Sequence, residues 1–444
     1  MNDSSPTTSS LDLVLALDSG SQSSRALLFD GQGQVLSQAS RAHAPMLYPS
    51  PGAVEQCPRD IRDCLFGASL DCLEAWGGDR GRIAAVAITT QRATAIPVDA
   101  DGEPMGDLVS WLDQRKASLQ SERSRVLRAA LRVMGEDALV PRLLSRSFAR
   151  QWRERDPALL AQLRWLTPLE AWIHHQLCGR MALAPGGLVG AWPVDVKRRD
   201  WDQRGLLMGL LGFRREWLPE IVEAGREIGQ VTAGGEALSG IPAGTSVISC
   251  GGDKQAEALG VGVRPQRPGI AAVSLGTAST LSVAVGRPRM SPSYRWFTVP
   301  SAEQGSWQLE YMVFRGFWTV AWFAREFARD LQAKAEAEGL PVEALLCREA
   351  ESVPPGSDGL VTWPRWSPTL QHPEEVGTLM GLRETHGRAQ VFRSLLEGIA
   401  FDLRRGRVVI ERASGEPIRE LRVGGGGSRS AVVVQLLADV LDLP

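Results

Sequence analysis

Cysteine is scarce in this chain of 444 residues, and its spacing argues against the common cysteine-based scaffolds. No pair has the CxxC spacing of redox or zinc motifs, and the residues from Cys57 to Cys72 fall in or beside one predicted helix. We therefore expect buried free thiols in a reducing compartment rather than disulfides or metal ligands. The six cysteines are Cys57, Cys64, Cys72, Cys178, Cys250 and Cys347.

Lysine is also rare, and the formal net charge is -2 at pH 7. A charge so close to zero argues against a broad nucleic-acid surface. The segment 123–155 is locally basic, but it has few interleaved aromatic residues and is most simply a solvated face. We expect no nucleic-acid partner. Lysine occurs at Lys116, Lys197, Lys254 and Lys334, so arginine is the usual cation.

Long apolar runs are absent, and none approaches the length of a membrane span. The first ten residues are rich in Ser and Thr and have neither the basic start nor the apolar core of a signal peptide. These features predict a soluble cytoplasmic protein with no membrane partner, in which residues 1–10 form a disordered tail.

Two familiar phosphate-binding signatures are missing as well. The sequence contains no GxxxxGK[ST] loop and neither the HRD nor the DFG signature of protein kinases. P-loop and protein-kinase chemistry are therefore disfavoured.

Apolar runs of strand length alternate with helical patterns along the chain, which is typical of an α/β fold. The length favours two or three domains. Glycine and small residues are concentrated between Gly225 and Gly244, and we place the domain boundary just after them, giving domains 11–247 and 248–444. The predicted strands are 13–17, 26–29, 83–89, 245–250, 270–275, 281–285 and 421–423.

One predicted helix is marked at both ends. Thr167 and Glu170 have the spacing of a capping box, Pro168 stands at the first helical position, and Gly179 stands where the helix should end. His174 and His175 lie inside this helix. Adjacent positions diverge by about 100° around a helix, so structural roles suit them better than a shared metal.

A glycine-containing turn joins the first two predicted strands and suits a phosphate. Gly20 would allow a positive φ and a close approach, while consecutive amides and serine hydroxyls would donate to anionic oxygens. Arg25 adds charge at the exit, and Asp18 at the strand end can face a magnesium ion. A polar hairpin, whose Gly and Ser merely suit the turn, explains the same residues.

Asp253 stands between a predicted strand and a predicted helix, directly after Gly251 and Gly252. The two glycines would leave space for a ligand, and a carboxylate at an interdomain cleft could act as the general base toward a substrate hydroxyl. The alternative is an ordinary helix N-cap. Lys254 is interpreted as a solvated residue in the first helical turn.

Two further glycine turns occur in the second half of the chain. The turn 274–279 lies between two apolar strands and repeats the first hairpin, so that the two hairpins could clamp a polyphosphate. The run 424–430 precedes a predicted helix, an arrangement that suits a nucleotide. Taken singly, each is also explained as an ordinary turn.

The order of these motifs resembles the FGGY carbohydrate kinases of the actin-like ATPase superfamily. The resemblance extends from about residue 11 to residue 444 and rests on the segments LDSGSQSSRALLFD, VAITTQRAT, SWLDQR, GREIGQVT, IPAGTSVISCGGDKQAEALGVG, SLGTAST, LLEGIAFDLRRG and LRVGGGGSRSAVVVQLLADVLDLP. It implies two actin-like, ribonuclease-H-like α/β domains flanking a catalytic cleft. The N-terminal domain would bind the sugar and the C-terminal domain the nucleotide.

The resemblance also implies roles for individual residues. Asp253 matches the catalytic base and, with Asp18, the carboxylates near Mg²⁺. The sugar would be contacted by Arg92, Trp111, Asp113 and Asp253. The ATP phosphates and adenosine would be contacted by Ser21, Gln22, Ser23, Arg25, Gly276, Thr277, Gly425, Gly426 and Ser430.

Departures from the family pattern concern mainly the substrate. Ala93 stands where glycerol kinases place a Glu and xylulokinases a His, and a methyl group cannot replace either contact. The segment 184–193 also replaces an acidic, serine-rich stretch, and GGDK replaces GDN or GDQ, so we expect a branch distinct from both groups. The C-terminal domain is expected to be truncated at Pro444, which would expose a sheet edge.

The sequence thus predicts an ATP-dependent kinase for a hydroxyl of a small sugar or polyol, with ATP and Mg²⁺ as cofactors. The choice of sugar and the formation of a homodimer stay open. A sugar- and nucleotide-binding sensor with weak turnover is the alternative, because the sugar pocket is altered and the chain is expected to stop early in its C-terminal domain. A chaperone-type or filament-forming ATPase is disfavoured, since TQRAT and SWLDQR resemble a sugar pocket.

Overall fold

The structure, a computed structural model, describes residues 12–118, 139–291, 293–367, 372 and 374–444. The predicted tail 1–10 and residues 123–138 of the basic segment lie outside this part of the chain. In the part described, no helix has both the length and the apolar character needed to cross a membrane. The chain divides into unit 1, with residues 1–256 and 300–304, and unit 2, with residues 257–299 and 305–444.

Unit 1 is built on a six-stranded sheet in the order β13-β14-β5-β1-β2-β3. Strand β1 (Leu13–Ser19) is antiparallel to β2 (Ser23–Phe29) and parallel to β5 (Ile83–Thr90), which is parallel to β14 (Ser246–Ser249). The carboxyl ends of β1, β5 and β14 therefore meet at one edge of the sheet, where α/β folds commonly bind ligands. The remaining strands are β3 (Val35–Ala42) and β13 (Glu227–Gln230).

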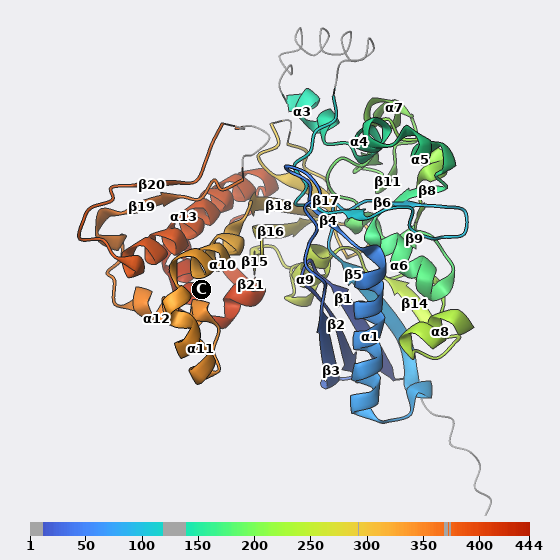
Figure 1. Cartoon of the computed structure of the whole chain (residues 1–444), viewed down its shortest axis with the longest axis horizontal. Helices are drawn as coiled ribbons and strands as arrows, with labels where there is room; N and C mark the ends of the chain where they lie inside the picture. The colour runs from blue at the N-terminus through green and yellow to red at the C-terminus, as the bar shows by residue number, and fades with distance from the viewer. Residues whose placement is uncertain (1–11, 119–138, 292, 368–371, 373) are drawn as a thin grey trace, which may run out of the picture. The chain divides into compact units, whose positions relative to one another are not determined.

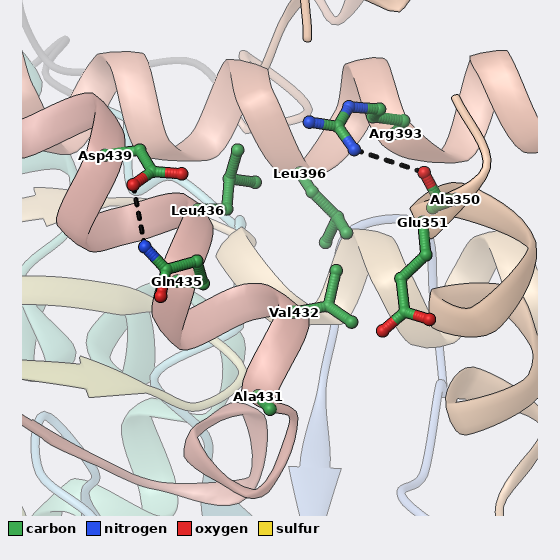
Figure 2. A pocket seen from close by; sticks show the side chains of 9 residues that line it. All are labelled: Ala350, Glu351, Arg393, Leu396, Ala431, Val432, Gln435, Leu436 and Asp439. Carbon is green, nitrogen blue, oxygen red and sulfur yellow. Dashed lines mark hydrogen bonds between the residues drawn. The ribbon is translucent and has the colours of Figure 1, made fainter. Parts of the chain in front are cut away.

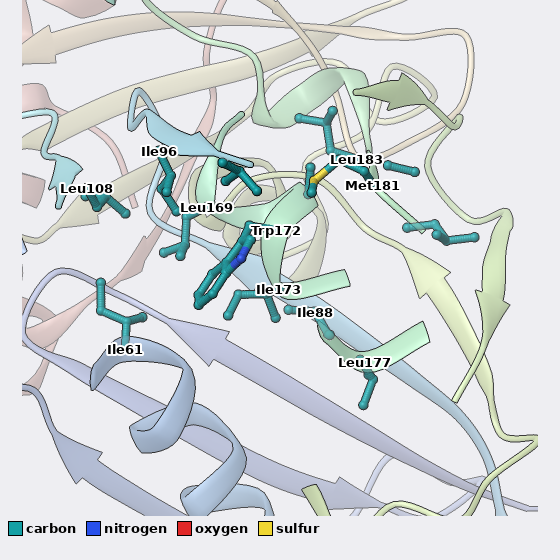
Figure 3. Close-up of a cluster of buried hydrophobic side chains, with 14 of the residues drawn as sticks. Ile61, Ile88, Ile96, Leu108, Leu169, Trp172, Ile173, Leu177, Met181 and Leu183 are labelled. Carbon is teal, nitrogen blue, oxygen red and sulfur yellow. The ribbon is translucent and has the colours of Figure 1, made fainter. Parts of the chain in front are cut away.

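Helix α1 (Pro58–Trp76) covers β1, β2 and β3 (Figure 1). Helix α6 (Leu169–Cys178) packs against β5 and against α8 (Ala233–Ser239). Figure 3 shows the core of this unit, in which Trp172 of α6 lies among isoleucine and leucine side chains. The other regular elements of the unit are β4 (Glu55–Gln56), β6 (Ile96–Val98), β7 (Leu108–Val109), α3 (Leu139–Ser145), α4 (Phe148–Arg155), α5 (Pro157–Gln162), β8 (Trp165–Thr167), β9 (Ala182–Leu183), β10 (Val194–Asp195), β11 (Asp200–Trp201), α7 (Leu206–Leu211) and β12 (Glu220–Ile221).

The predicted capping box of α6 is wrong. Thr167 belongs to β8, where it pairs with Ile96, and Pro168 precedes the helix without a side-chain cap. Glu170 is buried and accepts a hydrogen bond from the Ala184 amide 3.0 Å away, far along the chain. The predicted end is confirmed, because Gly179 ends the helix with a φ of 74°.

Unit 2 contains a five-stranded sheet in the order β17-β18-β16-β15-β21. Strand β15 (Ile270–Leu275) is antiparallel to β16 (Ser279–Val285) and parallel to β21 (Glu420–Gly424). The arrangement repeats β1, β2 and β5 of unit 1. The other strands are β17 (Phe297–Pro300), β18 (Trp307–Val313), β19 (Val361–Trp363) and β20 (Thr378–Met380).

Helix α13 (Arg388–Ser414) crosses β16 and β18 and carries much of the core of unit 2. Three helices pack on it: α10 (Gly316–Phe327), α12 (Val342–Glu351) and α14 (Ala431–Leu441). Helix α11 (Gln332–Glu338) lies between α10 and α12 in the chain, and α9 (Asp253–Gly260) spans the division between the units. Both units are α/β, and all seven predicted strands are confirmed with small shifts at their ends.

The six cysteines are free thiols, as predicted, but only half of them are buried. Cys57 is exposed at the start of α1, and Cys64 and Cys250 are half-buried. Cys72, Cys178 and Cys347 are buried.

Candidate active site

The carboxyl edge of the unit 1 sheet brings the predicted catalytic residue Asp253 next to the predicted sugar-binding residue Arg92. The amide of Gln91 donates to the Ser19 carbonyl over 2.7 Å, joining the ends of β5 and β1. The Thr89 hydroxyl donates to the Gly251 carbonyl over 2.9 Å, joining β5 to the turn before Asp253. Three chain segments that are distant in sequence thus meet around Asp253.

Asp253 is the first residue of α9, and its Oδ1 accepts from the Lys254 amide at 2.8 Å. Arg92 Nε lies 3.5 Å from the same oxygen, with the Arg92 side chain 7% exposed and that of Asp253 28% exposed. The amides two and three residues further along bond instead to the Gly252 carbonyl. The Asp253 side chain therefore does not act as the N-cap of α9. Its carboxylate lies beside the buried guanidinium group of Arg92.

The glycines before Asp253 do not leave room for a ligand, contrary to the prediction. A Cβ on Gly252 would lie 2.4 Å from Cγ and Cδ of Arg92, so Gly252 makes room for that arginine. Gly251 has a φ of 91° and faces Ala184, Gly186 and Gln255. Both positions serve the packing of protein against protein.

The turn between β1 and β2 holds the residues predicted to bind phosphate. Asp18 and Arg25 are opposite each other in the hairpin, with 3.4 Å between Oδ2 and Nη1 and with much of both side chains exposed. The expected positive φ of Gly20 is wrong, and its amide donates to the Ser23 carbonyl at 3.0 Å. Gln22 is exposed and Ser23 half-buried. The turn is therefore tight without a left-handed residue.

The other predicted sugar-side residues lie in the same unit but face different partners. Trp111 donates its indole N–H to Ser21 Oγ over 2.9 Å. Asp113 is 3% exposed in its side chain, pairs with Arg115 at 2.6 Å, and accepts from the Val54 amide at 3.0 Å. Asp113 is thus engaged by protein groups, whereas Arg92 lies beside Asp253.

Unit 2 brings the two later glycine turns together. A Cβ on Gly425, which has a φ of 84°, would lie 2.9 Å from the Leu275 carbonyl group, so this backbone contacts the end of β15. The carbonyls of Gly276 and Thr277 accept from the first amides of α10 at 3.2 Å. Gly426 has no neighbour within 4 Å of its Cβ position and faces open space. Ser430 caps α14 by accepting from the Val433 amide at 3.4 Å.

A pocket of about 360 Å³ is lined by residues of α12, α13 and α14 and is drawn in Figure 2. Arg393 of α13 donates to the Ala350 carbonyl at its rim over 3.2 Å, and Gln435 donates to Asp439 over 2.8 Å. None of the residues predicted to bind the nucleotide lines this pocket. Its walls are Ala350, Glu351, Arg393, Leu396, Ala431, Val432, Gln435, Leu436 and Asp439.

Glu170, which the sequence identified only as part of a capping box, is a buried carboxyl group of unit 1. Its side chain is buried, and Oε2 has no hydrogen-bond partner in the described residues and lies 2.2 Å from the Cβ position of Gly187. Burial raises the pKa of Glu170 to about 8, against a lowering by the Ala184 amide. One turn later in α6, burial lowers the pKa of His174 to about 4, against a raising by the Ala182 carbonyl. The spacing of Glu170 and His174 on one helical face was the available signal.

The described residues contain no cluster of three or more His, Cys, Asp and Glu side chains that could hold a metal ion. Mg²⁺ in phosphate-transferring sites needs only one or two carboxylates in addition to phosphate oxygens and water. Asp18 and Asp253 meet this requirement chemically, since both are partly exposed carboxylates at the same sheet edge.

Comparisons with known proteins agree with the architecture. The model of the N-terminal domain of the FGGY family of carbohydrate kinases matches residues 13–260, and that of the C-terminal domain matches residues 271–444. A glycerol kinase of Gloeobacter violaceus is 32% identical to this chain, with 97% of the chain and 84% of the relative covered.

The uncharacterized sugar kinase YgcE of Escherichia coli is 26% identical, with 97% of this chain and 80% of the relative covered. A solved xylulose kinase from Rhodospirillum rubrum has a TM-score of 0.78 and 24% identity, with 97% of this chain and 85% of that chain covered. At that identity the likeness concerns the fold.

Proposed function

The chain belongs to the FGGY family of carbohydrate kinases and is an ATP-dependent phosphotransferase for a small sugar or polyol, and we propose that Asp253 is its catalytic base. The observation that carries this assignment is the carboxylate of Asp253 at the carboxyl edge of β1, β5 and β14, with Arg92 Nε 3.5 Å away. A half-exposed carboxylate at this edge can reach a substrate hydroxyl.

In this proposal Asp253 accepts the proton of the attacking hydroxyl as its oxygen bonds to the terminal phosphorus of ATP, while the bond from that phosphorus to the bridging oxygen breaks and ADP leaves. Phosphoryl transfer demands mainly positioning and charge stabilisation. Arg92 lies beside the Asp253 carboxylate, where it fixes the direction of that group, and it is proposed to contact the sugar as well. Trp111 and Asp113 are proposed to shape the sugar side from the neighbouring loop.

The ATP phosphates are proposed to contact Ser21, Gln22, Ser23 and Arg25 of unit 1 and Gly276 and Thr277 of unit 2. Backbone amides in such turns are suited to anionic oxygens. Gly425, Gly426 and Ser430 are proposed to border the adenosine, and the open space at Gly426 supports this. Mg²⁺, held by Asp18 and Asp253, would supply charge neutralisation at the β and γ oxygens.

The proposal also divides the two ligands between the two parts of the chain. Residues 11–247 would bind mainly the sugar and residues 248–444 mainly the nucleotide, with Asp253 reaching the sugar hydroxyl and the first hairpin reaching the ATP phosphates. The six free thiols support a cytoplasmic, reducing environment.

The substrate is proposed to be a ketose or polyol other than glycerol. Ala93 has a φ of 54°, and its Cβ lies 3.4 Å from the Cβ position of Gly190. Its methyl group therefore faces a glycine and offers no hydrogen bond to a hydroxyl. A site that lacks such a partner loses the discrimination that the partner would give.

The test is a panel of sugars and polyols assayed by sugar-dependent ADP release, with wild type and Asp253→Asn side by side. We expect the best substrate to be one other than glycerol. Asp253→Asn should lose roughly 1,000-fold or more in kcat, by analogy with other essential proton-transfer groups, and keep ATP affinity close to wild type. Comparable turnover in the variant would remove Asp253 from the mechanism. If no sugar or polyol of the panel stimulated ADP release, the sensor would be favoured.

A further inference from the structure

Ser21, Gln91 and Gln56 form a closed circuit of hydrogen bonds at the turn between β1 and β2, with the Ser21 carbonyl as one of its acceptors. Ser21 Oγ donates to Gln91 Oε1 over 3.0 Å, and Gln91 Nε2 donates to Gln56 Oε1 over 2.9 Å. Gln56 Nε2 closes the circuit by donating to the Ser21 carbonyl over 3.0 Å. Trp111 Nε1 adds a fourth bond, to Ser21 Oγ, over 2.9 Å. We call these residues, Ser21, Gln56, Gln91 and Trp111, the glutamine ring.

The glutamine ring occupies the only hydrogen-bond donor of the Ser21 side chain. A hydroxyl has a single proton to donate, and that of Ser21 points to Gln91. The proton is thus unavailable to a phosphate oxygen. The hydroxyl oxygen is an acceptor and would not attract a phosphate oxygen either. The indole N–H of Trp111 likewise donates to Ser21, so Trp111 can offer a sugar only the face of its indole group.

The ring joins the two sides of the site. Ser21 lies in the turn proposed to hold phosphate, whereas Gln91 directly precedes Arg92, which lies beside Asp253. Gln91 and Gln56 are each 3% exposed, so their amide groups would be costly to leave unpaired. In this network each glutamine amide both donates and accepts a hydrogen bond, and such a largely buried network holds its members in one arrangement.

We propose that the glutamine ring is a positioning unit that fixes the phosphate turn relative to Arg92 and Trp111, with Ser21 serving phosphate through its backbone amide alone. The proposal rests on the proposed function for the identity of the two ligands. Gln56 is its clearest member, because it contacts the turn and Gln91 but has no proposed contact with either ligand.

The test compares Ser21→Ala and Gln56→Met with two controls. Gln56→Met keeps the length of the side chain and removes two bonds of the ring, whereas Ser21→Ala removes one hydroxyl from a half-buried turn and should fold in any case. Gln176→Met is the matched control, since Gln176 bonds to Arg62 and Gly102 outside the ring. Ser23→Ala is the control within the turn.

The first readout is amide hydrogen exchange without ligands, in peptides covering residues 19–23 and 89–92. Each ring variant loses two hydrogen bonds of the ring, so exchange should speed up roughly tenfold or more in Ser21→Ala and Gln56→Met, while both controls stay within about twofold of wild type. Exchange in Gln56→Met and Ser21→Ala that stays within about twofold of wild type would overturn the proposal. This readout needs no substrate, so it stands even if the proposed function fails.

The second readout is the steady-state kinetics of the wild type's best substrate. Ring variants should lower kcat/KM roughly tenfold for ATP and for the sugar alike, because one misplaced turn affects both. Ser23→Ala should raise the KM for ATP alone. If Ser21→Ala raises only the KM for ATP and Gln56→Met behaves as wild type, the Ser21 hydroxyl binds phosphate directly and the positioning role is wrong.

Discussion

At the scale of single residues, the site depends on close packing of protein groups around Asp253. Gly252 is the clearest case, because its missing side chain is replaced by Arg92. Arg92 in turn is buried and reaches the carboxylate. Arg92, which sets the direction of the proposed base, can therefore take its position only because residue 252 is a glycine.

Gly252→Ala should separate Arg92 from Asp253. The new methyl group would lie 2.4 Å from Arg92 Cγ and Cδ, a distance that forces the arginine to move. We expect kcat/KM for the sugar to fall roughly tenfold or more while the affinity for ATP alone stays near wild type, measured by steady-state kinetics and calorimetric titration. Gly209→Ala in α7, with no neighbour within 4 Å of its Cβ position, is the matched control and should keep wild-type kinetics. Equal effects of both substitutions would contradict the argument.

Glu170 should make the stability of unit 1 depend on pH. Its pKa is raised from 4.5 to about 8 in the folded chain, so between these values the folded state holds a proton that the unfolded state has released. The contribution of Glu170 to the stability is therefore fully present below about pH 4.5 and is lost as the pH rises through 8, by a total on the order of 5 kcal/mol. Glu170→Gln does not titrate and should escape this loss, so its advantage over wild type should grow between pH 5 and pH 8.

The measurement is the urea dependence of amide exchange in α6 at several pH values, for wild type and Glu170→Gln. Glu216→Gln is the control, because the Glu216 side chain is 65% exposed. His174 contributes equally to wild type and Glu170→Gln and cancels from the comparison. If the stability of wild type and that of Glu170→Gln changed with pH in parallel, the Glu170 carboxyl would not keep its proton on folding.

At the scale of elements, the strands were predictable and the contacts of polar residues were not. The strands β1, β5 and β15 are short apolar runs bounded by turn residues, and that signal is local. Thr167 and Glu170 also had a local signal, that of a capping box, but Thr167 pairs with Ile96 and Glu170 bonds to Ala184. Long-range partners outweighed the local preference, and a single sequence does not contain them.

The glycine turns show the same division. Their position after β1, β15 and β21 was predictable from the strands, whereas the close contact of Gly425 with Leu275 was not. The role of each glycine was not predictable either. Gly20 needs no positive φ, whereas Gly425 has one and also contacts Leu275 closely. Which space a glycine leaves open depends on neighbours from other parts of the chain.

Two neighbouring glycines of the last turn should respond differently to alanine. A Cβ on Gly427 would lie 2.6 Å from Phe317 and 2.8 Å from Leu275, so Gly427→Ala should destabilise unit 2 by about 1–3 kcal/mol. A Cβ on Gly426 meets nothing within 4 Å, so Gly426→Ala should keep the stability and raise only the KM for ATP. Ligand-free thermal unfolding and ATP kinetics together check both. A stable Gly426→Ala with an unchanged KM for ATP would remove Gly426 from the nucleotide site.

At the scale of the whole molecule, the described residues form two separate principal cores. The larger lies in unit 1 and includes Trp172, and the second lies in unit 2 around α13. The proposed sugar contacts Arg92, Trp111 and Asp253 belong to unit 1, whereas Gly276 and Gly426 belong to unit 2. A chain with two cores need not unfold in one step.

Calorimetry should therefore resolve two unfolding transitions, each raised by a different ligand. A ligand at 100 times its dissociation constant stabilises the state that binds it by about 2.7 kcal/mol. The sugar alone should raise the transition of unit 1, and ATP without sugar should raise mainly that of unit 2, with Gly426→Ala reducing the second effect and Gly252→Ala the first. Peptide-resolved hydrogen exchange during the same heating series assigns each transition to its unit. If the sugar alone raised both transitions equally, or if ATP stabilised unit 1 and left unit 2 unchanged, the division of the two ligands between the units would be wrong.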